Sequence, residues 1–216
     1  MSNGTFDFNL FLKESKETLL NPKSYFSTMK TAGGITEPLI KAVIYGFITG
    51  VISLLWGILK IGAVGGGLLG GAIGFMAFLW AIIGAVIGLF IGAVILLIIS
   101  SICKGNTDFE ANVRVTAAVM VIMPISALFG FTSGLNVWLG VIVSIIIYGY
   151  SLWLLYNGLV ESLKCNAATA KIICYVLIAI MALFLLLGVS TSNRAARFLN
   201  DFNKETKDMM KEMEKN

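Results

Sequence analysis

Five charged residues stand out because they lie in short segments between long apolar stretches. Two fall within residues 104–114 and three within residues 157–171: Lys104, Arg114, Glu161, Lys164 and Lys171. Side chains of both signs can bind a partner protein, and lysines near a membrane also bind anionic lipid headgroups. The same residues can equally anchor helix ends at the membrane surface and solvate loops. We treat the five as a candidate cytosolic interaction surface, with anchoring as the alternative.

Other side-chain chemistry is limited by the composition. The chain has no His, which excludes an imidazole base, a His metal ligand and a His pH switch. Its cysteines, Cys103, Cys165 and Cys174, form no CxxC pair, which argues against a zinc site, a dithiol redox centre and a disulfide framework. The sequence shows no nucleophile–base pair, metal-ligand set or phosphate-binding loop. It therefore predicts a protein that is not an enzyme and that carries no cofactor or metal.

The overall composition is that of a membrane protein. Of 216 residues, 57% are hydrophobic and 13% are charged, whereas soluble domains average about 45–50% apolar and about 25% charged residues. Four long stretches contain no charge: 42–59, 61–103, 115–160 and 172–193. These features exclude a soluble enzyme, a nucleic-acid-binding domain and a secreted disulfide scaffold. The net charge of +4 fits lysines that meet anionic lipid, so the expected partner is the lipid bilayer, with no nucleic acid.

The apolar stretches predict an all-α, polytopic bundle of membrane-spanning helices. A helix needs about 20 apolar residues to cross the hydrocarbon core, and lipid tolerates no unpaired backbone. Five spans are predicted, at residues 39–59, 75–101, 115–130, 137–156 and 172–189. Pro124 lies within the third span and is expected to kink it, because proline lacks the amide N–H that a helix uses.

A glycine-rich segment leaves the number of spans open. Residues 61–103 would form a helix about twice as long as the bilayer is thick, so this stretch must be divided. We interpret residues 61–74, which include seven glycines, as a re-entrant or interfacial segment. The alternative is two short spans with a tight turn, which gives six spans. Gly84, Gly88 and Gly92 recur every fourth residue and predict a face for close helix packing, or alternatively an oligomerising or pore-lining face.

Both ends of the chain differ in character from the apolar transmembrane domain, which is expected at residues 39–189. Residues 1–38 are predicted to be a cytosolic or interfacial amphipathic segment, because apolar residues are interleaved with Lys and Glu. This segment either lies in the headgroup plane or packs on the protein's own cytosolic face. Residues 190–216 are predicted to form a charged amphipathic helix, which either docks a partner or the membrane surface or is a solvated extension.

The distribution of Lys and Arg favours a cytosolic N-terminus. With five spans, the loops place four basic residues on the inner side of the membrane and one on the outer side. With six spans, both tails would be cytosolic, but all five basic loop residues would lie outside. The side of the membrane that holds the C-terminus therefore depends on the number of spans.

Three short motifs occur in order before the first, third and fifth predicted spans. They are Asn21-Pro22-Lys23-Ser24-Tyr25-Phe26 with Gly33-Gly34 and Glu37-Pro38, then Lys104-Gly105-Asn106-Thr107-Asp108-Phe109 with Arg114, and then Tyr156-Asn157-Gly158 with Lys164. Their order and spacing resemble the Yip family of Ypt-interacting membrane proteins, particularly its short prokaryotic members, over residues 18–190. The positions that carry the resemblance are Pro22, Phe26, Pro38, Gly105, Phe109, Tyr156 and Gly158.

The resemblance implies five spans, a cytosolic N-terminus and a non-enzymatic role, in a prokaryotic cytoplasmic membrane or alternatively an endomembrane. It does not include the Asp-Leu-Tyr-Gly-Pro motif of eukaryotic members, so their binding of small GTPases is not carried over. We therefore expect a membrane-organising or trafficking-type adaptor, with protein partners or a second copy of the chain. The alternative is a small-solute or ion transporter or channel built from Gly-rich helices, although no Asp, Glu, Lys or Arg lies within a span interior.

Overall fold

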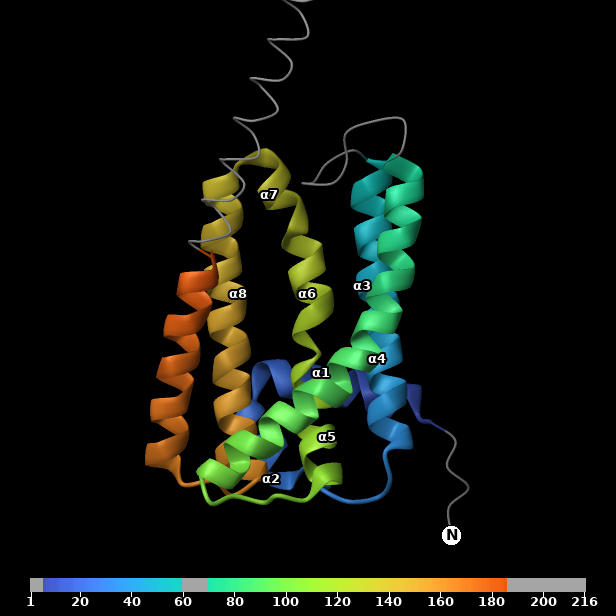
Figure 1. Cartoon of the computed structure of the whole chain (residues 1–216). Helices are drawn as coiled ribbons and strands as arrows, with labels where there is room; N and C mark the ends of the chain where they lie inside the picture. Colours follow the sequence, from blue (N-terminus) through green and yellow to red (C-terminus); the bar gives the residue numbers. More distant parts are fainter. Residues whose placement is uncertain (1–5, 60–69, 186–216) are drawn as a thin grey trace, which may run out of the picture. The chain divides into compact units, whose positions relative to one another are not determined.

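The computed structural model describes residues 6–59 and 70–185, and in these ranges the regular structure is helical (Figure 1). Residues Met1–Ile178 form one compact unit, and the remaining residues are assigned to a second. The amphipathic helix predicted for residues 190–216 lies outside the described residues, as does the greater part of the glycine-rich segment 61–74.

Five helical segments are long and apolar enough to cross a membrane. They are Thr36–Ile58, Phe75–Ile102, Phe109–Leu135, Val137–Ser162 and Ala167–Leu185, with mean hydropathies from 1.9 to 3.1. Each overlaps one predicted span, so the predicted all-α membrane bundle with five spans is confirmed. The described ranges contain no sixth segment of this kind.

The individual helices divide these spans further. The elements are α3 (Thr36–Ile58), α4 (Gly70–Ile102), α5 (Phe109–Val119), α6 (Ile122–Leu128), η1 (Phe129–Phe131), α7 (Thr132–Leu135), α8 (Val137–Asn157) and the π-helical turn η2 (Gly158–Ser162). The third span thus consists of α5, α6, η1 and α7, and the fourth consists of α8 and η2. The fifth span is the unlabelled helix Ala167–Leu185.

Two glycines of α3 allow α3 and α4 to pack closely. A Cβ added to Gly46 would lie 2.7 Å from the Cβ of Ala85 and 2.9 Å from the carbonyl oxygen of Ala81. A Cβ added to Gly50 would lie 3.0 Å from the carbonyl oxygen of Phe78. Any larger residue at these positions would therefore push the two helices apart.

Of the three glycines of α4 that were predicted to form a packing face, only Gly92 closely approaches a neighbouring helix among the described residues. A Cβ added to Gly84 or Gly88 would have no heavy atom of the described chain within 4 Å, whereas one at Gly92 would lie 2.9 Å from Cγ2 of Thr116. The stripe that α4 buries instead is Ala85, Leu89, Ala93 and Leu96. One residue rotates a helix by about 100°, so this stripe is adjacent to the glycine face. The four-residue spacing defines a face, but it does not determine which face meets a neighbour.

The third span is broken near its middle, as Pro124 predicts. Pro124 is the third residue of α6, and the two residues between α5 and α6 are outside any helix. Proline has no N–H to donate to the carbonyl four residues earlier. That carbonyl belongs to Met120, and it accepts a hydrogen bond from the amide of Met123 at 2.9 Å instead. The break separates α5, most of which is buried, from α6, which buries no residue fully.

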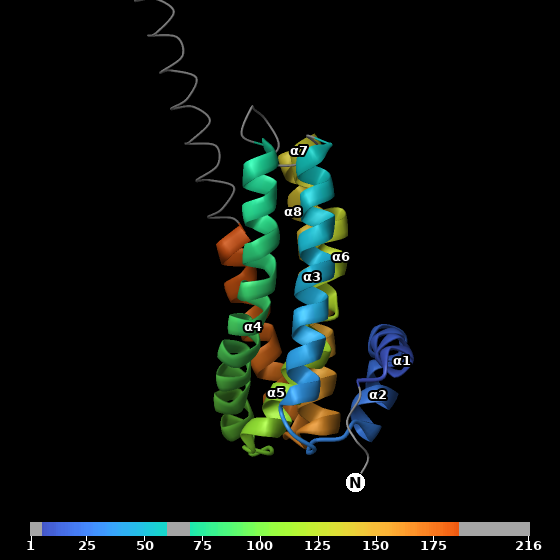
Figure 2. The ribbon, with the colours of Figure 1, turned by 90° about the vertical axis from the view of Figure 1, so that its right-hand side faces the viewer.

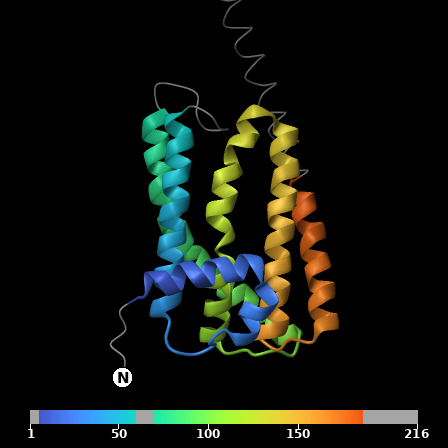
Figure 3. The same cartoon turned by 180° about the vertical axis from the view of Figure 1, so that it is seen from behind.

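Two short helices, α1 (Phe8–Leu20) and α2 (Pro22–Thr28), precede the first span. α1 runs across the spans rather than parallel to them (Figures 2 and 3). Its first turn is capped by Asp7, whose Oδ1 accepts hydrogen bonds from the backbone amides of Asn9 and Leu10. Pro22 is the first residue of α2, where a missing N–H costs nothing.

The faces of α1 have different surroundings. Phe11 and Thr18 are each only 2% exposed, and the Phe11 ring lies 5.2 Å from that of Tyr45 on α3. Phe8 and Leu12 are 55% and 50% exposed. α1 therefore packs on the protein's own helices and still presents apolar side chains outward, as an interfacial helix does.

Candidate functional site

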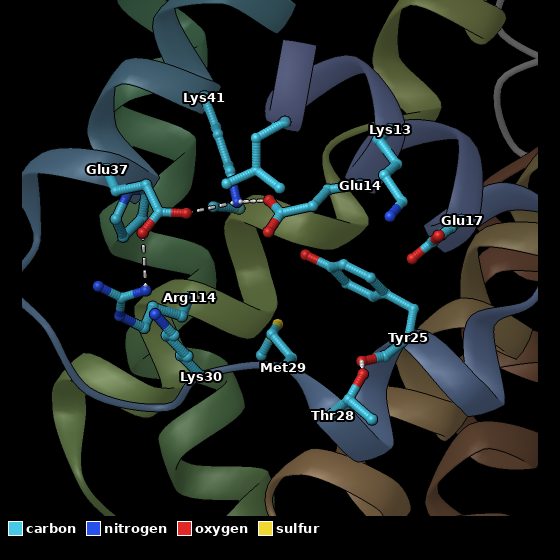
Figure 4. A pocket seen from close by; sticks show the side chains of 13 residues that line it. Lys13, Glu14, Glu17, Tyr25, Thr28, Met29, Lys30, Glu37, Lys41 and Arg114 are labelled. Carbon is cyan, nitrogen blue, oxygen red and sulfur yellow. Dashed lines mark hydrogen bonds and ion pairs between the residues drawn. The ribbon is translucent and has the colours of Figure 1, made fainter. Parts of the chain in front are cut away.

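Five charged side chains form an ion-pair cluster where α1, α3 and α5 meet, and Figure 4 shows four of them: Glu14, Glu37, Lys41 and Arg114. The cluster comprises Glu14, Glu37, Lys41, Glu110 and Arg114. The Nζ atom of Lys41 lies 2.6 Å from Oε2 of Glu14 and 2.8 Å from Oε1 of Glu37. Nη1 of Arg114 lies 3.1 Å from Oε2 of Glu37, and its Nε lies 3.1 Å from Oε1 of Glu110. Glu37 therefore bridges the two cations.

The two cations of the ion-pair cluster are buried. The side chain of Lys41 is 11% exposed and that of Arg114 is 7% exposed. A buried charge is stable only when partners compensate for the lost water, and here each cation contacts two carboxylates. The cluster thus fixes the positions of three helices relative to one another, because moving any of them would leave a charge uncompensated.

The loop before α3 is also bound to the ion-pair cluster. Gly33 and Gly34 have φ values of +134° and +94°, which side chains other than glycine rarely adopt. The Gly34 amide donates a hydrogen bond of 2.6 Å to Glu110, and its carbonyl accepts one of 2.9 Å from Nη2 of Arg114. A Cβ at Gly33 would lie 2.9 Å from that same nitrogen. This glycine pair therefore lets the backbone approach the guanidinium closely.

Two overlapping cavities, of about 340 and 480 Å³, open beside the ion-pair cluster. Both are lined by Glu14, Lys30, Glu37, Lys41 and Arg114, and α1 forms one wall. Tyr25, Lys13 and Glu17 also line the smaller one, and Figure 4 shows the Tyr25 hydroxyl directed toward it. Burial raises the pKa of the Tyr25 phenol above its ordinary value, so it stays protonated and can donate a hydrogen bond. We call the two overlapping cavities together the N-terminal cavity.

Two loops that are far apart in the sequence pair near the ion-pair cluster. The amide of Asn106 donates to the carbonyl of Leu163 at 2.7 Å, and the amide of Asn166 donates to the carbonyl of Cys103 at 2.9 Å. The hydroxyl of Ser100 donates to the carbonyl of Asn106 at 2.8 Å. We call residues 103–106 and 163–166 the paired loops. Residues 103–106 lead from the second span toward the third, and residues 163–166 join the fourth span to the fifth.

Two glycines of the family motifs lie where these elements touch. A Cβ at Gly105 would lie 2.7 Å from Oγ of Ser100 and 2.9 Å from the carbonyl oxygen of Leu163. A Cβ at Gly158 would lie 2.6 Å from Cγ1 of Val115. Both motif glycines are therefore explained by close packing rather than by backbone conformation.

The remaining motif positions have structural surroundings. Phe26 and Pro38 are buried, and Phe26 lies in the apolar core beside Gly158. Phe109 is the first residue of α5, and it remains 37% exposed. Tyr156 is partly buried against the same core. Most of these positions thus hold the helices together at the end of the bundle where the two loops pair.

The five residues of the predicted interaction surface occupy different environments. Arg114 is buried in the ion-pair cluster, whereas Lys104 and Lys164 are exposed on the paired loops, where each has a φ of 56°. Glu161 lies 3.9 Å from Nζ of Lys23, and the Lys171 ammonium lies 5.9 Å from the centroid of the Tyr175 ring. The structure therefore separates Arg114 from the other four.

Sequence reasoning missed four members of the ion-pair cluster as a site: Glu14, Glu37, Lys41 and Glu110. Arg114 is the one member of the cluster among the predicted site residues. A signal was present, because Glu37–Lys41 and Glu110–Arg114 are oppositely charged pairs four residues apart, each in the first turns of a span. Such a pair is ordinary on an exposed helix surface. At the edge of a bilayer, burying its charges is costly, so the pair indicates that further charged side chains of the protein lie beside it.

The cysteines of the chain are buried. Cys103, Cys165 and Cys174 are free thiols with 7% exposure or less. Burial raises the pKa of Cys103 to about 11, and the neighbouring thiol of Cys165 raises it as well. Among residues 6–59 and 70–185, no group of three or more His, Cys, Asp or Glu side chains is placed to hold a metal ion.

Comparison with known proteins gives one match. No curated protein and no solved structure matches the chain. The model of the Yip1 domain matches residues 16–189, close to the range over which the motifs resemble the Yip family. The match covers all five membrane-spanning helices and the paired loops, and so includes α3 and α5 of the ion-pair cluster. Of the elements before the first span, it covers α2 and the last residues of α1. The resemblance is therefore confirmed, and the chain belongs to the Yip1 domain family.

Proposed function

We propose that this integral membrane protein is a non-enzymatic, membrane-organising or trafficking-type adaptor, with its N-terminus in the cytosol. The observation that carries the proposal is the gathering of charge at one end of the bundle. The nine Lys and Arg residues within the described ranges all lie on α1, α2, the loop after α2, the paired loops and the first two turns of the spans: Lys13, Lys16, Lys23, Lys30, Lys41, Lys104, Arg114, Lys164 and Lys171. Cytoplasmic segments of membrane proteins carry such an excess, which supports a cytosolic location for this end.

The proposed partner surface consists of the paired loops and the start of the last helix. Lys104, Lys164 and Lys171 are exposed there, and Glu161 is partly exposed beside them. Arg114, in contrast, has a positioning role, because its guanidinium holds α3, α5 and the Gly33–Gly34 loop together. A rigid base with exposed charges suits the docking of a protein partner at a prokaryotic cytoplasmic membrane.

The orientation is tested by cysteine labelling in intact cells. Lys23→Cys places a thiol at a position with 79% side-chain exposure at the proposed cytosolic end, and Leu135→Cys places one at the opposite end, where Leu135 is 64% exposed. A membrane-impermeant maleimide is expected to label Leu135→Cys in intact cells, and Lys23→Cys only after permeabilisation. The reverse pattern would refute a cytosolic N-terminus.

The adaptor role is tested by photo-crosslinking in native membranes. A photoreactive residue at Lys104 or Lys164 is expected to capture one discrete protein, and the same residue at Leu135 is expected not to capture it. Reversing the charges of Lys164 and Lys171 should reduce that product several-fold if charge complementarity drives the docking. Equal capture from both ends, or capture that is insensitive to charge reversal, would contradict the proposed surface.

The transporter alternative has less support. Residues 115–160, which cover the third span beyond its first turns and most of the fourth, contain no charged side chain that could couple transport to an ion gradient. The charged residues at the start of the third span, Glu110 and Arg114, are paired with each other. In a liposome assay with a panel of ions and neutral solutes, we expect no flux above that of empty vesicles. Flux that depends on the protein would restore this alternative.

A further inference from the structure

The N-terminal cavity has polar groups that the ion-pair cluster leaves uncommitted. The ammonium groups of Lys13 and Lys30 have no carboxylate within 4 Å among the described residues. Arg114 has five N–H donors and uses three of them, on Glu110, Glu37 and Gly34. With the Tyr25 hydroxyl, these donors face a cavity of about 340 Å³, within the range of small-ligand sites (Figure 4).

The same cavity also holds an uncommitted carboxylate. Glu17 lines it from α1, and its side chain makes no ion pair or side-chain hydrogen bond with the described residues. Glu14 and Glu37, in contrast, are bound to Lys41. Spare cationic donors and a spare anionic acceptor thus face one space.

The charges around the two overlapping cavities are balanced. Four basic residues line them (Lys13, Lys30, Lys41 and Arg114), and so do four acidic residues (Asp7, Glu14, Glu17 and Glu37). A ligand with a large net charge of either sign would disturb this balance. A zwitterion preserves it, because its anionic group meets the lysines and the arginine while its cationic group meets Glu17.

The position of the cavity indicates where such a ligand comes from. α1 forms one wall, and its exposed Phe8 and Leu12 are suited to the boundary between headgroups and acyl chains. The cavity beneath α1 therefore lies at the depth of phospholipid headgroups. Leu10 and Met29 add apolar surface to the cavity lining, where a glycerol backbone can rest.

We propose that the N-terminal cavity binds a zwitterionic phospholipid headgroup, with the phosphate held by Lys13, Lys30 and Arg114 and the amine held by Glu17. This binding requires only that the chain lies in a bilayer. It can therefore be tested separately from the adaptor role, whose proposed surface is at the paired loops.

The test uses the purified full chain in detergent and two short-chain lipids with identical acyl chains. Phosphatidylethanolamine carries a phosphate and an amine, whereas phosphatidylglycerol carries the phosphate alone. We expect the full chain to bind phosphatidylethanolamine at least about tenfold more tightly, measured as ligand-dependent thermal stabilisation. Equal affinity for the two lipids would overturn the proposal.

Three single substitutions separate the two halves of the site. Lys30→Gln and Lys13→Gln should weaken the binding of both lipids. Glu17→Gln should weaken only phosphatidylethanolamine, so that the affinity ratio falls toward one. None of these residues belongs to the ion-pair cluster, so the fold should be retained, and the thermal stability of each variant without lipid checks this.

The matched control is Lys16→Gln, which removes the same charge from the exposed part of α1 outside the cavity lining. We expect it to leave both affinities unchanged. An effect equal to that of Lys13→Gln would mean that general surface charge attracts the lipid, and it would overturn the site. A ratio unaffected by Glu17→Gln would overturn the assignment of the amine.

Soluble compounds distinguish a lipid from a free headgroup as the source. Glycerophosphoethanolamine has the headgroup without acyl chains, and inorganic phosphate has the anion alone. Much weaker binding of glycerophosphoethanolamine than of the lipid supports a membrane source, and equal binding would overturn it in favour of a soluble zwitterion. Inorganic phosphate that binds as tightly as either would overturn the role of the amine.

Discussion

At one end of the bundle, where α1, α3 and α5 meet, buried cations are held by pairs of carboxylates, and two loops are joined by backbone hydrogen bonds. At the other end, the turn from α6 to α8 has no charged residue. It is held by the cap of Asn136 on α8 and by the indole of Trp56, which donates to the carbonyl of Ala127 at 2.9 Å. The difference arises from charged residues in the first turns of α3 and α5, which have no counterpart at the opposite end among the described residues.

The comparison shows how a short membrane protein can fix one end more strictly than the other. Buried ion pairs are directional and costly to leave incomplete, so the charged end has essentially one acceptable arrangement. Apolar contacts and a single cap tolerate small displacements, because burial is non-directional. We therefore expect substitutions at the charged end to cost more than equivalent ones at the opposite end.

The largest effect is expected for Arg114→Met. It removes the cation that neutralises Glu37 and Glu110, and breaking a buried pair in this way typically costs about 3–5 kcal/mol. Thermal unfolding of the purified protein in detergent measures the loss. Lys104→Met is the matched control, because Lys104 is exposed at the same end and should cost less than about 0.5 kcal/mol. Similar losses for both variants would refute the role of the ion-pair cluster.

A smaller difference is expected between two glycines. Gly105→Ala forces a Cβ to within 2.9 Å of the Leu163 carbonyl oxygen and should cost about 1–3 kcal/mol. Gly130→Ala, at the opposite end, adds a Cβ with no heavy atom of the described chain within 4 Å and should change stability by less than about 0.5 kcal/mol. Unfolding midpoints of the two variants give the comparison, and it fails if Gly130→Ala is the more damaging.

Removing a helix cap should lower the free energy of unfolding by the same amount at both ends. Oδ2 of Asp108 accepts from the Ala111 amide at 2.9 Å, and Oδ1 of Asn136 accepts from the Trp138 amide at 2.8 Å. Replacing either cap by Ala should cost about 1 kcal/mol. Equal losses would show that the ends differ through ion pairs and close packing rather than through capping. A much larger loss for Asp108→Ala would mean that its charge contributes to the charged end beyond the cap.

The smallest effect concerns the native thiols, which we expect to react little with maleimide at neutral pH. All three are buried, and a pKa of about 11 leaves almost no thiolate at Cys103. Because the folded pKa is raised, any stability from this group is present below pH 9 and is lost as the pH rises toward 11. Leu135→Cys provides an accessible thiol as the positive control. Rapid labelling of the wild-type chain would contradict the burial.

Several features were predictable because they depend on local sequence alone. A span requires about 20 apolar residues, so the lengths of the uncharged stretches indicated a bundle of five spans, with six as the alternative. Pro124 lacks an N–H wherever it lies in a helix, so the break in the third span followed from one residue. The motifs around Pro22, Gly105 and Gly158 were sufficient to indicate the family, because the order and spacing of motifs can be recognised in the sequence without any knowledge of contacts.

Other features required the fold, because they depend on which segments meet. Arg114 was expected at a surface, but α3 supplies Glu37 to it from 77 positions earlier in the chain. Gly84 and Gly88 were expected on a face for close helix packing, but the close contact between α3 and α4 lies at Gly46 and Gly50 and on the neighbouring stripe of α4. Periodicity describes each helix by itself and contains no term for its neighbour.

The sequence by itself thus determined the solvent, the helical class of the bundle and the family, since these depend on hydropathy summed over 20 residues and on short ordered motifs. Only the tertiary structure decided which charges face one another and where a polar cavity remains. The physical reason is that the cost of burying Lys41 or Arg114 depends on whether a carboxylate lies within about 3 Å, and packing alone sets that distance.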